Sequence, residues 1–186
     1  YGGGLKRFDP YNGTFETFLN IYTQETSLSN NNVLDIYRDS QDNFWFSTND
    51  GLNIYNRGND RFVRFMSDPA NQEDSNNLSN SNVNGIFEDY AGMYWISTSG
   101  GGLNVFSPTM NRFQHVKNDP SRPSSLISDM VWAFQQDYDG TLWVANDAGV
   151  DMKRKDAGYF IHFDPHPEDL RNENDADYTI LRDSTG

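Results

Sequence analysis

Three histidines are the only imidazoles available for catalysis or metal binding in this chain of 186 residues. His162 and His166 lie four positions apart with Asp164 between them, and two imidazoles plus a carboxylate are ligands that Zn²⁺ accepts. Pro165 also lies between them and no third imidazole is near, so we predict no metal site. His115 and His162 fall in short β-type runs, where we expect exposed positions on an edge strand rather than catalytic groups.

Carboxylates are abundant, with 27 aspartates and glutamates. Glycosidase chemistry needs two of them facing one cleft, but most aspartates here lie in turn-like sequence, where they accept hydrogen bonds from the backbone. Residues 137–140 resemble the start of a calcium loop but lack the oxygen ligands that follow at alternate positions, so we predict a hairpin turn. The sequence contains no phosphate loop, Gly-x-Ser-x-Gly or His-Glu-x-x-His motif. We therefore predict no catalytic residue, no metal and no cofactor.

The overall charge narrows the range of partners. The formal net charge is −13, and a surface this acidic repels phosphate backbones and anionic lipid. We expect no nucleic-acid partner, and membrane contact only through segments outside the chain. The absence of cysteine excludes a disulfide scaffold, and no stretch approaches the ~18 apolar residues of a membrane span. Residues 1–4 do not look like a natural start, so we expect the chain to be a piece of a longer protein.

The strongest pattern in the sequence is a threefold repeat. The copies begin at Leu28, Leu78 and Leu126, which are 50 and then 48 residues apart. In each copy a tryptophan follows the leucine by 17 residues and an aspartate stands six residues before that tryptophan. The three tryptophans are Trp45, Trp95 and Trp143.

Each copy divides into four short β-prone runs, which in the first copy are residues 33–39, 44–48, 51–56 and 61–65. Aspartate and glycine between the first two runs favour a tight hairpin, and a glycine opens the third run, where a positive φ is expected. A repeated four-stranded antiparallel unit of this length is typical of a β-propeller blade. The sequence therefore predicts an all-β protein built of propeller blades.

The ends of the chain match only parts of the repeat, and this sets the predicted boundaries. Residues 1–27 form a partial blade with its third and fourth strands, and residues 170–186 hold the first strand of a further blade, at 178–183. The whole blades are residues 28–77, 78–125 and 126–169. We predict one propeller domain of about four blades, which is a fragment of a larger ring.

Residues 28–55 and 78–106 carry the pattern Leu-Ser-Asn-x-Asn-Val, then Asp, Trp, Ser-Thr and Gly-Leu-Asn, which resembles the two-component regulator propeller repeat. The third copy is looser, with Ala145 and Asn146 in place of Ser-Thr. The resemblance implies a seven-bladed parent propeller in the periplasmic sensor of a bacterial hybrid histidine kinase or diguanylate cyclase, anchored in the inner membrane. It also implies a non-enzymatic role, with an oligosaccharide or another small extracellular ligand as the partner.

The tryptophans of the repeat are interpreted as blade core, because a residue that recurs at one position in every copy serves the architecture. Residues that break the repeat are better candidates for recognition. Trp132 stands on the first strand, where the other copies have Leu34 and Asn84, and the first strand of a blade lines the central channel. Trp132 and Asn84 are therefore predicted ligand contacts, although Trp132 alternatively fills a wider gap between blades.

Two further groups of residues are predicted to contact a ligand. Arg38, Glu88 and Gln136 share one position near the end of the first strand but differ in chemistry, so they either flank the channel or are solvated. The turns between the second and third strands lie on the same rim as the long polar loops that join blades, and loops of this kind often carry recognition. The turn residues are Asn49, Asp50, Asn146 and Asp147.

Two alternatives to a sensor remain open at the level of sequence. The first is a carbohydrate-active propeller lyase or hydrolase, supported only by the acidic rim and the histidines. The second is an assembly module, because an incomplete ring has open sheet edges that favour self-association. Two copies would supply about the number of strands in seven four-stranded blades.

Overall fold

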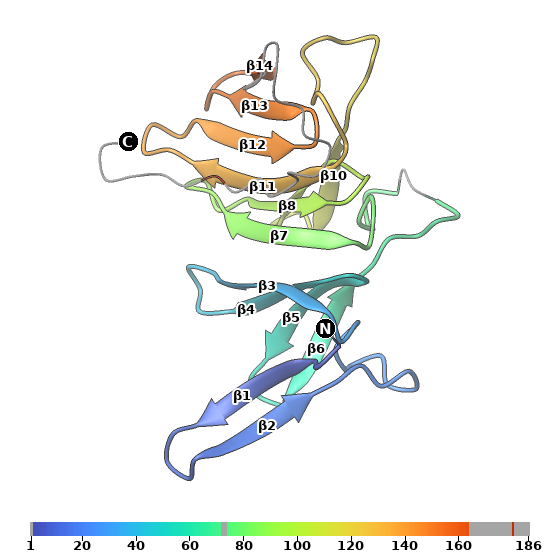
Figure 1. Cartoon of the computed structure of the whole chain (residues 1–186), viewed down its shortest axis with the longest axis vertical. Helices are drawn as coiled ribbons and strands as arrows, with labels where there is room; N and C mark the ends of the chain where they lie inside the picture. The colour runs from blue at the N-terminus through green and yellow to red at the C-terminus, as the bar shows by residue number, and fades with distance from the viewer. Residues whose placement is uncertain (1, 72–73, 164–179, 181–186) are drawn as a thin grey trace, which may run out of the picture.

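The computed structural model describes residues 2–71, 74–163 and 180, and every regular element within them is a β-strand (Figure 1). Three sheets have four strands and one sheet has two, and neighbouring strands within each sheet are antiparallel. The described residues form no helix that is long and apolar enough to cross a membrane. The predicted all-β fold of four-stranded antiparallel blades is confirmed, while the predicted strand at 178–183 falls outside this description except for Ile180.

The four sheets follow one another along the chain. The first sheet pairs β1 (Leu5–Asp9) with β2 (Thr14–Phe18). The second sheet is β3 (Val33–Arg38), β4 (Phe44–Thr48), β5 (Gly51–Asn56) and β6 (Arg61–Phe65). The third is β7 (Val83–Glu88), β8 (Tyr94–Thr98), β9 (Leu103–Ser107) and β10 (Arg112–Val116). The fourth is β11 (Val131–Gln136), β12 (Leu142–Asn146), β13 (Gly149–Lys153) and β14 (Ile161–Phe163).

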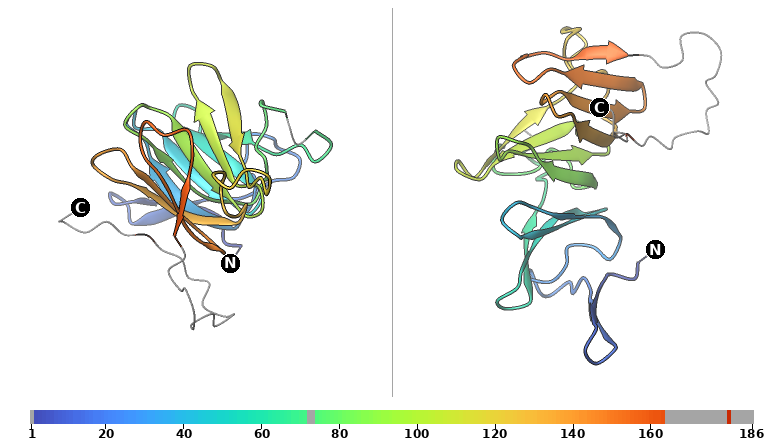
Figure 2. Two further views of the ribbon diagram at one scale, coloured as in Figure 1. Left: turned by 90° about the horizontal axis from the view of Figure 1, so that it is seen from above. Right: turned by 90° about the vertical axis from the view of Figure 1, so that its left-hand side faces the viewer.

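The sheets stack face to face, with β1–β2 at one end and β11–β14 at the other (Figure 1). The first strands of successive four-stranded sheets are neighbours, since β3 contacts β7 and β7 contacts β11. These strands form one edge of the stack, called here the inner edge, and the fourth strands lie on the opposite, outer edge. Figure 2 shows the same stack from above and from the side.

A turn between the first and second strands explains the spacing of aspartate and tryptophan in the repeat. Asp39 Oδ1 accepts hydrogen bonds from the backbone N–H groups of Gln41 and Asn43, at 3.0 and 2.8 Å. Its Oδ2 accepts one from the indole Nε1 of Trp45 at 2.9 Å. A carboxylate at this position therefore fixes the turn and the ring together. The same indole–aspartate bond recurs at 2.8 Å between Trp95 and Asp89 and at 2.6 Å between Trp143 and Asp137.

The expected glycine conformations at the start of the third strands are present. Gly51, Gly102 and Gly149 have φ values of 107°, 70° and 140°, in the region that favours glycine. At Gly102 an added Cβ would stand only 2.3 Å from the carbonyl oxygen of Val116 on the neighbouring β10. The close approach of two strands therefore requires glycine there for space as well as for backbone angle.

Apolar side chains fill the three joints between facing sheets. The joint between the second and third sheets includes Trp45, which is 4% exposed and packs against Tyr94 and Phe65 with ring centroids at 4.9 and 5.8 Å. Burial of such rings is the main favourable term in folding. The other buried side chains of this joint are Leu52, Leu78, Val83, Ile86, Ile96, Phe106 and Phe113.

A buried asparagine connects the third strand to the loop that precedes the first strand. Asn53, which is 0% exposed, accepts a hydrogen bond from Ser29 N at 2.9 Å and donates one to Ser29 Oγ at 2.8 Å. Asn104 makes the same two bonds with Ser79, at 2.8 and 2.9 Å. The paired amide and hydroxyl satisfy each other without charge, as buried polar groups require.

Candidate functional site

The candidate ligand contacts on the inner edge lie at a β-bulge, where one residue of the first strand has no direct partner on the second. The pairing of β3 with β4 shifts between Val33 and Asp35, so Leu34 is the bulged residue. The same shift places Asn84 and Trp132 at the bulge of β7 and β11. Bulges re-aim side chains and are frequent next to binding sites. A position at which the three repeats differ is therefore also the irregular position of each blade.

Asn84 and Trp132 have different surroundings at this position. The Asn84 side chain donates a hydrogen bond to the Val131 carbonyl at 2.7 Å and accepts one from Ser99 Oγ at 3.1 Å, so it joins the third and fourth sheets. The Trp132 side chain is partly buried, and its indole Nε1 is buried with no hydrogen-bond partner. A buried indole N–H without an acceptor is unusual, because buried donors are nearly always paired. The indole N–H of Trp132 is thus unpaired but enclosed by protein, whereas the Asn84 amide is paired across the joint.

A second candidate region is a cavity of about 520 Å³ between the second and third sheets, called here the rim cavity. It is formed by the β4–β5 turn, the loop after β6 and the loop before β7. Ser81 closes its wall, accepting a hydrogen bond from Gly51 N at 2.6 Å and pairing with the Ser67 hydroxyl at 2.8 Å. The lining residues are Asn49, Asp50, Met66, Ser67, Pro69, Ser79, Asn80, Ser81 and Asn82.

The four predicted turn residues divide between two blades. Asn49 and Asp50 are exposed and line the rim cavity. Asp147 is exposed in the corresponding turn of the fourth sheet. Asn146 is fully buried and donates to Asp151 Oδ2 at 3.0 Å, which argues against direct contact with a ligand.

The rim cavity also contains a polar atom that the sequence did not single out. The side-chain carbonyl Oδ1 of Asn82 is buried and has no hydrogen-bond partner. The backbone of Asn82 is held on both sides, because its N–H donates to Asn80 Oδ1 at 2.8 Å and its carbonyl accepts from Ser99 N at 2.9 Å. The cavity therefore has a wall of fixed geometry. The Asn82 Oδ1 is enclosed in that wall, and the equivalent Asn32 Oδ1 of the second sheet is likewise buried without a partner.

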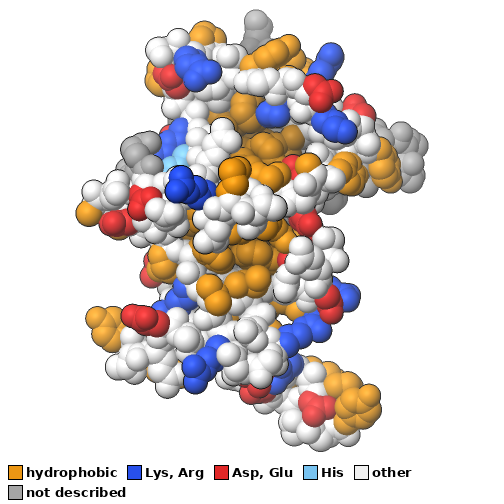
Figure 3. Space-filling view, turned by 180° about the vertical axis from the view of Figure 1, so that it is seen from behind, with side chains coloured by type: hydrophobic (Ala, Val, Ile, Leu, Met, Phe, Trp, Pro, Cys, Tyr) orange, Lys and Arg blue, Asp and Glu red, His pale blue; other side chains and the backbone are white. Residues whose placement is uncertain are grey.

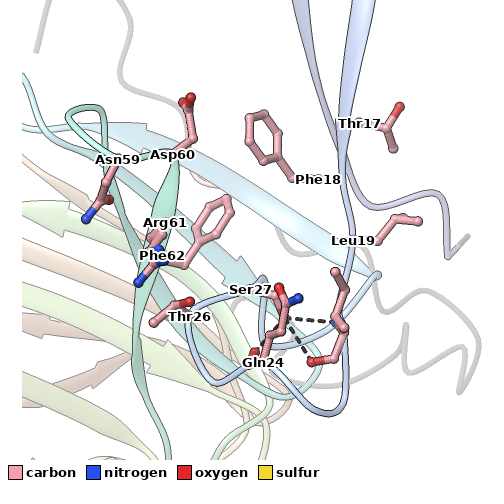
Figure 4. Close-up of a pocket in the computed structure, with 11 residues that line it drawn as sticks. Thr17, Phe18, Leu19, Gln24, Thr26, Ser27, Asn59, Asp60, Arg61 and Phe62 are labelled. Carbon is pink, nitrogen blue, oxygen red and sulfur yellow. Dashed lines mark hydrogen bonds between the residues drawn. The ribbon is translucent and has the colours of Figure 1, made fainter.

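A third candidate region is a cavity of about 510 Å³ on the outer edge between the first and second sheets (Figure 4). The rings of Phe18 and Phe62, with centroids 5.7 Å apart, supply its apolar part. Its polar groups include the Ser27 hydroxyl, whose bonds within the adjoining loop are dashed in Figure 4, and Asp60, which binds Arg7 at 3.0 Å. These groups are engaged within the protein, so the rim cavity is the better candidate for a ligand.

Residues at the end of the first strand join neighbouring blades. Glu88 accepts hydrogen bonds from Ser40 N at 2.7 Å and from Ser40 Oγ at 2.8 Å, across the joint between the second and third sheets. Gln136 accepts one from Tyr90 N at 3.3 Å across the next joint. Arg38, at the same position of the second sheet, is exposed and binds Asp42 within its own turn. The carboxylate of Glu88 is thus used between blades rather than presented to a ligand.

Substitution of Glu88 with alanine is expected to lower the free energy of unfolding by about 1 kcal/mol, because two hydrogen bonds across a joint are lost. The change is measured by urea denaturation of the variant and the parent chain. A double-mutant cycle with Ser40→Ala isolates the contact. Full additivity of the two substitutions would contradict the assignment of Glu88 to the joint.

His115 and His162 lie on the edge strands β10 and β14 as expected, but the expectation that they are exposed is wrong. His115 is partly buried and its Nε2 donates to the Asn77 carbonyl at 2.9 Å. His162 has a side chain that is 28% exposed, and its Nε2 donates to the Pro123 carbonyl at 2.6 Å. Both rings hold the loop that leads into the first strand of their own blade. The position of both histidines on edge strands predicted that they would be exposed, but the adjacent loop covers both side chains.

The fourth sheet replaces the buried asparagine of the other blades with Asp151, which is 0% exposed. Asp151 Oδ2 accepts a hydrogen bond from Ile127 N at 3.0 Å, and Oδ1 binds the Nδ1 of His162. This is the one carboxylate–imidazole ion pair within 2–71 and 74–163. Over the same ranges no three acidic or histidine side chains are grouped for a metal ion, and His166 lies outside them.

The tryptophans of the repeat lie at the joints or at the end of the stack. Trp45 fills the joint between the second and third sheets, and Trp95 packs against the apolar cluster between the third and fourth. Trp143 belongs to the last described sheet, is partly buried and contacts Phe163 with ring centroids at 5.7 Å. None of the three lines the rim cavity.

Four-stranded antiparallel sheets stacked face to face, with their first strands along one edge, define the chain as part of a β-propeller. The profile of the two-component regulator propeller family matches residues 27–50, 77–100 and 125–148 of the chain. The resemblance seen in the sequence is thereby confirmed. Among curated proteins, none matches the chain with significance.

Solved structures share the fold. The extracellular domain of a protein described as a hybrid two-component system from B. thetaiotaomicron is 27% identical, with a TM-score of 0.68 over 78% of this chain and 20% of that one. PorZ, a surface component of the type-IX secretion system of Porphyromonas gingivalis, is 16% identical, with a TM-score of 0.56 over 79% of this chain and 20% of its own. Virginiamycin B lyase from Staphylococcus aureus is 14% identical, with a TM-score of 0.60 over 89% and 50%. The chain spans about a fifth of the length of the first two proteins and half of the third.

Proposed function

We propose that this chain is part of the extracytoplasmic sensor propeller of a bacterial two-component signalling protein of the hybrid histidine kinase type. The region itself is non-catalytic in this proposal and binds a small ligand. The observation that carries the proposal is the set of three two-component regulator propeller repeats together with the similarity to an extracellular domain of a hybrid two-component system. The kinase and the inner-membrane anchor belong to the longer protein that the proposal assumes.

The proposed ligand site is the rim cavity. Its lining presents the Ser67 hydroxyl and the carboxylate of Asp50, and it buries the unpaired carbonyl Oδ1 of Asn82. Hydroxyl, amide and carboxylate groups suit a neutral ligand with several hydroxyl groups, since each hydroxyl both donates and accepts. An oligosaccharide is the ligand class that this lining supports best. Trp132 lies on the inner edge and is a secondary candidate, because its indole N–H also lacks an acceptor.

A panel of oligosaccharides tested by thermal shift and calorimetry is expected to contain one that raises the melting temperature of the chain, because ligand binding to the folded state stabilises it. Substitution of Asp50 with alanine is expected to weaken that ligand about tenfold, equivalent to ~1.4 kcal/mol. Asp147→Ala is the matched control, because Asp147 is also exposed in a turn of the same type but lies outside the rim cavity.

Two results would contradict the proposal. Equal losses of affinity in Asp50→Ala and Asp147→Ala would remove the rim cavity as the site. Absence of any stabilising ligand, or chemical conversion of the bound oligosaccharide, would contradict the non-catalytic sensor role. Product analysis of the incubated oligosaccharide by mass spectrometry distinguishes binding from turnover.

A further inference from the structure

The rim cavity borders a position at which one joint between blades differs from two others. The position is the second residue after the strand that ends a blade, and it holds Asn20 after β2, Ser67 after β6 and Asn118 after β10. In each case the backbone N–H of this residue donates to a side chain of the loop that leads into the next first strand. The acceptors are Asn31, Ser81 and Asp129, at 2.6, 2.9 and 2.6 Å. The three positions are therefore equivalent in structure as well as in sequence.

Asparagine at this position closes the joint with its side chain. The Asn20 carboxamide nitrogen donates to the consecutive carbonyl oxygens of Leu28 and Ser29, at 2.8 and 2.9 Å. The Asn118 nitrogen makes the same pair of bonds with the two equivalent carbonyls of its own joint, at 2.7 and 3.1 Å. A carboxamide has two N–H donors, so one side chain satisfies both carbonyls of the loop.

Ser67 leaves the equivalent carbonyls, those of Leu78 and Ser79, without this donor. The Ser67 hydroxyl pairs instead with the hydroxyl of Ser81 at 2.8 Å. Among the described residues no side chain donates a hydrogen bond to the carbonyl oxygen of Leu78 or of Ser79. Ser67 and Ser79 both line the rim cavity. The cavity therefore lies where the other joints hold a carboxamide, and it adjoins the acceptors that the carboxamide satisfies there.

The loop that begins at Ser67 is also longer than its counterparts. Residues 68–77 connect Ser67 to the next repeat, whereas residues 21–27 and 119–125 connect the two asparagines to theirs, so three residues are added here. Loops that vary among otherwise similar units frequently carry recognition. The shorter side chain and the insertion distinguish the same joint, and both border the rim cavity, through Ser67 and Pro69.

We infer that Ser67 determines which ligand the rim cavity accepts, and that the ligand places two neighbouring hydroxyl groups where the other joints hold the asparagine carboxamide. This role rests on the proposed function of the rim cavity as the ligand site. The two hydroxyls donate to the carbonyl oxygens of Leu78 and Ser79, as the two N–H groups of the carboxamide do elsewhere. The ligand is therefore a sugar with a free pair of neighbouring hydroxyls, and the Ser67→Asn substitution excludes it.

Charge favours a neutral sugar over an acidic one. A chain with a formal net charge of −13 repels anionic ligands. On the face of the molecule shown in Figure 3, acidic and basic side chains are interspersed with each other. The described residues that line the rim cavity include the carboxylate of Asp50, which can accept a further hydroxyl, but no lysine or arginine. An acidic sugar would thus meet a carboxylate in the cavity and no cation.

The first test needs no ligand. Ser67→Asn is expected to raise the urea concentration at the midpoint of unfolding, because the carboxamide gains two hydrogen bonds to carbonyls of buried residues. Asn118→Ser is expected to lower the midpoint, because the same two bonds are lost. Ser67→Ala, which removes the hydroxyl without filling the space, is not expected to raise it. A midpoint for Ser67→Asn that is equal to or below that of the parent chain would overturn the inference, since the cavity would then not fit the carboxamide.

The second test is calorimetric titration with four tetrasaccharides, the α-1,4-linked and β-1,4-linked tetramers of glucose and of galactose. At least one is expected to bind the parent chain, and Ser67→Asn is expected to weaken its binding at least ~10-fold, because the carboxamide occupies both acceptors. Ser67→Ala is the matched control. It is expected to change the affinity less than ~3-fold, because the Ser67 hydroxyl is already paired with Ser81.

Asp50→Ala separates the role of Ser67 from the proposed function. Weaker binding of the tetrasaccharide to Asp50→Ala, with unchanged binding to Ser67→Asn, would keep the rim cavity as the ligand site and contradict the role of Ser67. Unchanged binding to both variants, or no binding of any of the four tetrasaccharides, would contradict both. Tighter binding of the β-1,4-linked tetramer of glucosamine than of its glucose counterpart would overturn the hydroxyl pair, because an ammonium group would then be the donor.

Discussion

Replacement of Trp45 with alanine is expected to lower the free energy of unfolding by about 3–5 kcal/mol. The side chain is 4% exposed and packs against Phe65 and Tyr94, so its removal leaves a cavity in the joint between two blades. It also removes the indole donor from Asp39. Burial disfavours the Asp39 carboxylate, but hydrogen bonds from Trp45, Asn43 and Tyr94 outweigh that effect and hold its pKa below the usual range. Urea denaturation followed by circular dichroism measures the loss.

Trp143→Ala is the matched control, because Trp143 occupies the same position of the repeat and makes the same bond to an aspartate. It stands in the last described sheet and is only partly buried, so the expected loss is less than half of that for Trp45. Equal losses for the two variants would show that the aspartate turn, and not packing at the joint, determines the contribution of the tryptophan.

The ion pair of Asp151 and His162 is expected to make the fourth sheet less stable as the pH rises above neutrality. Both nitrogens of the His162 ring face acceptors, the Asp151 carboxylate and the Pro123 carbonyl, so the cationic imidazolium satisfies both. Burial lowers the pKa of His162, but these hydrogen bonds and the charge of Asp151 raise it more, and the net pKa is above its ordinary value. Burial raises the pKa of Asp151, despite the hydrogen bonds that it accepts.

Both shifts lower stability as the pH rises, but the carboxyl shift acts from its unfolded pKa of about 3.9 and the histidine shift from about 6.5, so the loss above neutrality is assigned to His162. A histidine whose pKa is raised in the folded state contributes fully below its unfolded pKa of about 6.5, and the contribution is lost as the pH rises through the folded pKa. A carboxyl group whose pKa is raised is likewise less favourable in the folded state once it ionises. A hydrogen bond to a charged group contributes about 1.5–3 kcal/mol, which sets the expected size of the loss. Thermal unfolding between pH 6 and pH 9 measures it.

Two variants copied from the other blades serve as controls for the pH effect. His162→Arg keeps the positive charge at every pH and reproduces Arg64, which stands at the same position of β6 and also binds the preceding loop. Asp151→Asn restores the asparagine of the other blades. Both variants are expected to flatten the decline above pH 6.5. An unchanged pH profile in both would show that another group titrates in this range.

The blade was predictable because the residues that define it interact within a single copy of the repeat. The interval from Asp39 to Trp45 belongs to a single hairpin, in which the carboxylate binds both the turn and the indole, so sequence spacing alone reveals it. The bulge at Asn84 and Trp132 was not predictable, because it depends on how two strands align and leaves no mark in composition. These two positions could still be identified as candidates, because the residue type differs among the repeats there.

Contacts between one repeat and the next could not be predicted from the sequence. Glu88 was predicted to flank the channel or to be solvated, because its partner, Ser40, lies 48 residues earlier at a position with no conspicuous pattern. The burial of His162 was missed for a related reason, since the loop that covers it belongs to a different part of the repeat. Asn82 was not singled out because an unpaired carbonyl is defined by its surroundings and not by residue type.

The contacts across the joints also join residues that are synthesised at different times. Asp39 accepts a hydrogen bond from the Tyr94 hydroxyl at 2.8 Å, and Ser40 in the same turn donates to Glu88. In the next blade Tyr90 donates to Gln136. These two turns are therefore completed by residues about 50 positions later in the chain. At a synthesis rate of ~5–20 residues per second, those residues leave the ribosome roughly 3–10 seconds after the turn that they complete. The apolar face of a newly synthesised blade therefore remains exposed until the next blade has left the ribosome.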